Sequence, residues 1–155
     1  MVDCAVIFGI PIATPPTATI VREYTMSASP GTVRIFSILN GLTLLGVLLQ
    51  AVWAGEFIGR SGRHNWVTVH EIGAFVVVVL ALATAAAAVA LRRASSAVTW
   101  GALGLFVLIV VQTGLGEAIT KGDANELIAA HVPIAVLIFG LGIYLSGVGA
   151  RLRRG

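Results

Sequence analysis

Two histidines, His70 and His131, are the residues whose type and spacing point most directly to chemistry. Each lies in an otherwise apolar stretch, and the residues around the first recur about 61 positions later around the second. The first copy contains Gln50, Gly55, Glu56, Ile58, His70, Arg92 and Arg93, and the second contains Gln112, Gly116, Glu117, Ile119, His131, Arg153 and Arg154. This self-similarity predicts a duplicated helical hairpin in which each copy supplies one histidine.

The chain that must position these residues is strongly apolar. Of its 155 residues, 57% are hydrophobic and 11% are charged, and its mean hydropathy is +0.97. Four apolar runs, at residues 32–57, 66–91, 96–118 and 127–149, each reach the roughly 20 residues that cross the hydrocarbon of a bilayer. Because that hydrocarbon offers backbone groups no water to bond, the runs must be helices. We therefore predict an all-α membrane protein, an up-down-up-down four-helix bundle made of two repeated hairpins.

Basic residues predict the orientation of this bundle. The side that holds both termini carries Arg22, Arg34, Arg92, Arg93, Arg151, Arg153 and Arg154, whereas the other carries Arg60, Arg63 and Lys121. The positive-inside rule then places both termini in the cytoplasm, and we expect a multi-pass protein of the bacterial plasma membrane. The basic pI of about 9.8 reflects this topology, and without a basic and aromatic patch we expect no nucleic-acid partner.

Residues 1–30 differ from the rest, because their apolar patch is short and four prolines interrupt them. They fit neither a signal peptide nor a span, so we expect a poorly ordered segment ahead of a bundle at residues 31–155. We also hypothesise that translation starts at Met26.

Four polar residues are predicted to share one depth. His70 and His131 each lie four residues inside the outer ends of the second and fourth spans, or about 6 Å deep. Gln50 and Gln112 lie near the outer ends of the first and third spans. Polar groups inside a membrane cost free energy unless they are partnered or functional, so this layer is a predicted site. Trp53, Trp66 and Trp100 are predicted to lie at the membrane interfaces.

Two neutral imidazoles on different helices suit the two axial positions of a haem iron. Arg60, Arg63 and Lys121 would then neutralise the haem propionates on the outer side, and small residues would let the macrocycle lie between helices. Those small residues are Gly73, Ala74, Ala81, Ala135 and Gly142.

Other metal sites fit this ligand set less well. A structural zinc site requires four nitrogen or sulfur ligands, and a di-iron site requires glutamate three residues before each histidine, where this chain has Val67 and Ile128. The roles of Gln50 and Gln112 stay open: they could hold the histidines, contact the haem edge, or link helices by hydrogen bonds.

The arrangement resembles one half of haem A synthase, a membrane family built from two four-helix halves that each carry a histidine on their second and fourth spans. The resemblance covers residues 41–154. It rests on Gln50 with Gly55 and Glu56, on Val-His70-Glu-Ile-Gly73, on Gln112 with Gly114 and Gly116, and on Ala-His131-Val-Pro-Ile-Ala135.

The resemblance implies that His70 and His131 ligate a b-type haem. It also implies a limit, because the family's catalytic half has glutamate three residues before the first histidine and this chain has Val67 there. The chain therefore resembles the cofactor-holding half, and oxidation of a haem methyl group would require a second copy or another protein.

The function expected from these features is that of a small b-type cytochrome-like protein, which holds one haem near the outer face for electron transfer or haem handling. The alternative is an accessory or assembly subunit of a larger respiratory or transport complex with no cofactor of its own. Whether the protein is an enzyme stays open, because a haem-modifying reaction would need Glu56 or Glu117 as acid or base. Expected partners are the lipid bilayer and either a second copy or such a complex.

Overall fold

The computed structural model describes residues 29–59, 63–122 and 124–154, and all regular elements within them are helical. They are α1 (Pro30–Gly59), α2 (Arg63–Ala90), α3 (Ser96–Lys121), the 3-10 turn η1 (Asn125–Leu127) and α4 (Ile128–Leu152). This confirms the predicted all-α fold. Of the predicted N-terminal segment, residues 1–28, with Met26, lie outside the described part of the chain.

Local sequence explains where these helices begin and end. Pro30 opens α1, a position where the missing amide hydrogen costs nothing. The Ser95 hydroxyl caps α3 by accepting from the amide of Val98 at 3.3 Å, and the amide of Gly122 closes the same helix on the carbonyl of Ala118 at 3.0 Å. Pro133 is tolerated inside α4 because it lies near the first turns of that helix.

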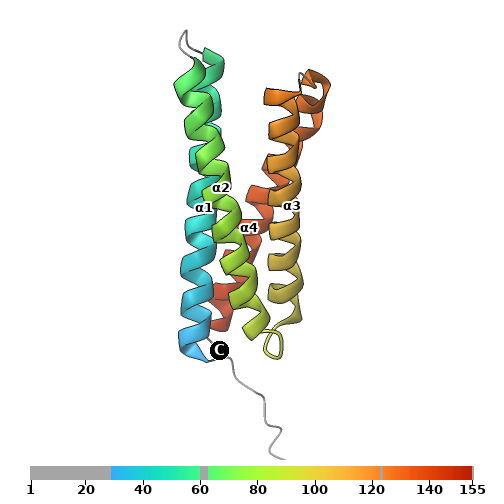
Figure 1. Ribbon diagram of the computed structural model, residues 1–155. Coiled ribbons are helices and arrows are strands. Elements are labelled where there is room, and N and C mark those ends of the chain that lie inside the picture. The colour runs from blue at the N-terminus through green and yellow to red at the C-terminus, as the bar shows by residue number, and fades with distance from the viewer. Residues whose placement is uncertain (1–28, 60–62, 123, 155) are drawn as a thin grey trace, which may run out of the picture.

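The four helices form an antiparallel bundle in which each packs against two neighbours, α1 on α2, α2 on α3, α3 on α4, and α4 on α1 (Figure 1). We call the end with the start of α1, the α2–α3 turn and the end of α4 the arginine end. The opposite end, where α1 meets α2 and α3 meets α4, is the hairpin end. Each helix contains a segment long and apolar enough to cross a membrane, at Pro30–Glu56, Asn65–Ala90, Ser96–Lys121 and Asn125–Leu152, within about three residues of the predicted spans.

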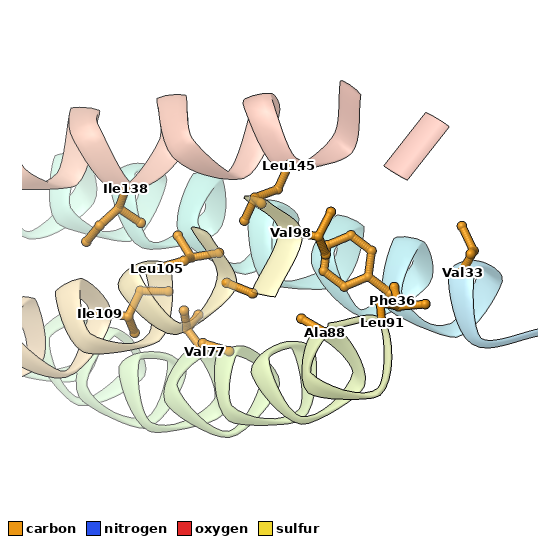
Figure 2. Close-up of a cluster of buried hydrophobic side chains, with 12 residues drawn as sticks. Val33, Phe36, Val77, Ala88, Leu91, Val98, Leu105, Ile109, Ile138 and Leu145 are labelled. Carbon is orange, nitrogen blue, oxygen red and sulfur yellow. The ribbon is translucent and has the colours of Figure 1, made fainter. Parts of the chain in front are cut away.

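The hydrophobic core occupies the half of the bundle nearer the arginine end. Its fully buried side chains come from all four helices and interdigitate between them, from Val33 on α1 to Ile109 on α3 and Ile138 on α4 (Figure 2). From that level to the hairpin end, Gly73 is the only described residue that is buried. The ribbons of the two hairpins draw apart toward this end (Figure 1). The half that contains the two histidines is therefore less tightly closed.

Polar side chains also lock the core half together. The amide nitrogen of Asn40, which is fully buried, donates to the carbonyl of Gly142 at 2.9 Å and to the hydroxyl of Ser146 at 2.8 Å. These bonds hold α1 against α4. The hydroxyls of Thr43 and Thr84 meet at 3.1 Å and join α1 to α2.

Glycine at position 142 permits the close approach of α4 to α1, because a Cβ there would lie 2.6 Å from a methyl carbon of Leu44. We expect Gly142→Val to lower the free energy of unfolding by about 1–3 kcal/mol through overpacking. The matched control is Gly140→Val, on the same helix, where a Cβ would meet nothing within 4 Å. Unfolding of the detergent-solubilised protein in SDS measures both, and equal destabilisation would contradict close packing at this position.

Candidate functional site

His70 lies on α2, five residues into its membrane span, with its ring turned toward α1. The Nδ1 atom is 3.2 Å from the backbone carbonyl oxygen of Gln50. Because a carbonyl can only accept, Nδ1 is the donor in this bond, which leaves the lone pair of the neutral ring on Nε2. Metal-ligating histidines are commonly oriented by this kind of bond.

The side chain of Gln50 lies at the contact between α1 and α2. Its amide nitrogen and the ring of Trp53 both press on the Cα of Gly73, so closely that a Cβ at position 73 would overlap them. Both the nitrogen and the oxygen of the Gln50 amide are buried, and neither makes a hydrogen bond to any residue that the structure describes. Such unpaired polar atoms are costly, so their retention inside a membrane needs an explanation.

The second hairpin uses the corresponding residues differently. The amide nitrogen of Gln112 on α3 donates to the backbone carbonyl of His131 on α4 at 2.8 Å. The ring of His131 lies against α3 at Gly116, with its Cε1 atom 3.3 Å from the place that a Cβ there would take. Within the described part of the chain, the buried Nδ1 of His131 and the buried amide oxygen of Gln112 have no hydrogen-bond partner.

A one-residue difference in spacing explains why the two hairpins differ. Gln50 precedes His70 by 20 positions, whereas Gln112 precedes His131 by 19. One residue turns a helix by about 100°, so the two glutamines cannot present the same group to their histidines. In the first hairpin, the backbone carbonyl of Gln50 accepts a hydrogen bond from the imidazole of His70. In the second, the side-chain amide of Gln112 donates to the backbone carbonyl of His131.

The predicted polar layer is thus present near the hairpin end, with one member from each helix. The span of α4 begins at Asn125, six residues before His131, so both histidines lie at about the same depth. The structure brings Gln50 to His70 in the first hairpin and Gln112 to His131 in the second, and both pairs lie in the half of the bundle that lacks a buried core.

Of the three cationic residues predicted to neutralise haem propionates, the structure describes the side chain of Lys121 alone. Arg60 and the side chains of Arg63 and His64 lie outside the described part of the chain. The Lys121 ammonium is exposed and forms an ion pair with Glu117, one turn earlier on α3, at 3.2 Å. This pair lies at the end of α3 that is closer to the polar layer.

Three of the five small residues that were expected to leave room for a macrocycle between the helices are covered by the protein itself. Gly73 is covered by Trp53, Gly142 is covered by Leu44, and Ala81 lies in the core at 1% exposure. Side chains of the protein itself fill the space beside them. Ala74 and Ala135 are half-buried.

Sequence reasoning did not connect Trp53 with Gln50, and it missed Asn40 altogether. Trp53, which was expected at the membrane interface, packs between α1 and α2 beside Gln50. Its position three residues after Gln50 places both on one face of α1 and was the available signal. Asn40 was missed although an amide in the middle of an apolar span is itself a sign of an interhelical bond.

No family model, curated protein or solved structure matches the chain. The described side chains include no group of three or more His, Cys, Asp or Glu residues that could hold a metal ion by themselves.

The two glutamines give a matched test of this geometry in haem-free protein. We expect Gln50→Leu to raise the free energy of unfolding by about 1 kcal/mol, because it removes two buried atoms without partners. Gln112→Leu should give no such gain, because it also removes the bond to the His131 carbonyl, worth about 0.6 kcal/mol. SDS unfolding curves compare the two variants. A Gln50→Leu protein less stable than Gln112→Leu would contradict the assignment.

Proposed function

We propose that this protein is a small b-type cytochrome-like membrane protein that holds one haem between His70 and His131. The observation that carries the proposal is the polar layer itself. The imidazoles of α2 and α4 share one level in their spans with buried polar atoms that have no hydrogen-bond partner among the described residues. Unpartnered polar atoms at membrane depth are typical of a binding site.

The number of protein ligands favours haem over other metal centres. A porphyrin supplies four nitrogen atoms to its iron, so two histidines complete the coordination. Zinc and di-iron centres need three or more protein ligands, and the described side chains offer no such group.

The surroundings of each histidine also suit a ligand role. The Gln50 carbonyl holds the His70 ring by Nδ1, and Nε2 is the nitrogen that would ligate iron. The ring of His131 lies beside Gly116, where its Cε1 atom is 3.3 Å from the place that a Cβ would take. A haem held by His70 and His131 would supply a one-electron couple, and ligation by both histidines would suit electron transfer rather than oxygen binding.

The test is the absorption spectrum of full-length protein expressed with ample haem and purified in detergent. We expect a Soret band in the wild-type protein and its loss or reduction in His70→Ala and His131→Ala. His64→Ala is the matched control, because His64 lies at the start of α2, about two turns from His70, and should leave the band unchanged.

An unchanged spectrum in both variants would overturn the proposal. Protein that carries no haem and co-purifies with a larger complex at fixed stoichiometry would instead support the accessory subunit that the sequence left as the alternative.

A pair of glycine variants tests the placement of the His131 ring. We expect Gly116→Leu to reduce haem loading several-fold, because the new side chain would occupy the space beside the imidazole. Gly114→Leu is the control on the same helix, since a Cβ at position 114 would meet nothing within 4 Å. The ratio of Soret to protein absorbance measures loading, and equal loading in the two variants would show that the ring does not depend on Gly116.

A further inference from the structure

We propose that the seam between α1 and α4 at the arginine end binds the phosphodiester headgroup of an anionic phospholipid, held by Arg153 and Arg34. This inference is independent of haem binding, because the seam lies at the opposite end of the bundle from the polar layer.

Charge is segregated along the bundle. The described basic residues of the arginine end are Arg34, Arg92, Arg93, Arg151, Arg153 and Arg154. The described acidic residues, Glu56, Glu71, Glu117 and Glu126, all lie toward the hairpin end. The arginine end therefore presents positive charge that none of these carboxylates neutralises, and anionic headgroups are its natural complement.

Arg153 is held in a defined position at this end. Its guanidinium reaches from α4 across to α1 and donates to the Ser37 hydroxyl. That hydroxyl in turn donates to the Val33 carbonyl at 2.8 Å, so it is free to accept from Arg153. Close packing at Gly149, 3.2 Å from the Ser37 oxygen when a Cβ is placed there, brings the two helices together.

Arg34 lies on the same side of α1. Ser37 and Leu44 both contact α4, and Arg34 is about 60° from Ser37 around the helix, on the rim of that face. Arg34 is exposed and makes no hydrogen bond or ion pair to any residue that the structure describes. Two guanidinium groups beside one seam can bind one phosphodiester through several charge-assisted hydrogen bonds.

An acyl chain has room beside this pair. Gly41 lies two turns from Arg34 on the same face of α1, is exposed, and has nothing within 4 Å of an added Cβ. Ile143 of α4 is 52% exposed. The headgroup site thus continues into an apolar surface at membrane depth, which favours a phospholipid over free phosphate.

The internal repeat allows the α1–α4 contact to be compared with its counterpart, the contact between α2 and α3. Arg92 corresponds to Arg153 in the first copy, yet its guanidinium folds back to the Val89 carbonyl of its own helix at 3.3 Å. Asn40 and Ser146, which bond across the α1–α4 seam, correspond to Ala102 and Ala85 at the other seam. Between α2 and α3 the Thr99 hydroxyl donates to the Ala88 carbonyl at 2.9 Å, whereas the polar bonds between α1 and α4 include one from an arginine, Arg153.

The test is native mass spectrometry of the full-length protein, released from an equimolar mixture of phosphatidylglycerol and phosphatidylcholine with identical acyl chains. We expect preferential retention of phosphatidylglycerol by the wild type and about a fivefold loss of that preference in Arg153→Gln and in Arg34→Gln. Arg92→Gln removes the same charge from the same end and should change the preference by less than about twofold.

Ser37→Ala is a charge-neutral variant that removes the acceptor of the Arg153 bond. It should also reduce retention of phosphatidylglycerol, which a diffuse electrostatic attraction would not predict. Equal losses in Arg92→Gln and Arg153→Gln, or no preference in the wild type, would overturn the proposal. Displacement of phosphatidylglycerol by millimolar inorganic phosphate would overturn it as well, because the site would then belong to the free anion.

Discussion

The constraint on which this structure depends is that hydrocarbon satisfies no polar atom. Helices satisfy the backbone groups by internal hydrogen bonds, and their exposed apolar side chains face lipid without cost. The few polar side chains must find partners within the bundle or from a ligand. The amide nitrogen of Asn40 bonds to α4, although its buried amide oxygen has no partner among the described residues. The side chain of Gln50 has no such bond through either atom. The half of the bundle near Asn40 is thus joined by side-chain bonds between α1 and α4, and the half near Gln50 is the candidate binding half.

The same constraint explains which features could be predicted from the sequence and which could not. Span length is fixed by bilayer thickness, so four helices and their approximate limits followed from composition alone. The level of His70 and His131 followed from the distance of each to the end of its span. Side-chain partners did not follow, because a shift of one residue turns a helical side chain by about 100°. The spacings of 20 and 19 residues give Gln50 and Gln112 different partners, although the repeat suggested equivalence.

Small residues were also hard to interpret from sequence. Gly73 and Gly142 were expected to leave space for a macrocycle, but Trp53 and Leu44 fill that space. A glycine in a membrane helix indicates that another group packs closely against the helix, but it does not identify that group. Whether the approaching group is a cofactor or a neighbouring side chain depends on which helix faces it, and that is settled by packing over the whole bundle.

We propose that His70 and His131 together ligate one haem. Electron paramagnetic resonance of the oxidised, full-length protein tests it most directly, because the ligands of ferric haem determine its spin state. We expect a low-spin signal in the wild type, and a high-spin signal or no haem signal when either histidine is replaced by alanine. A high-spin signal in the wild type, or a low-spin signal that survives both replacements, would contradict it.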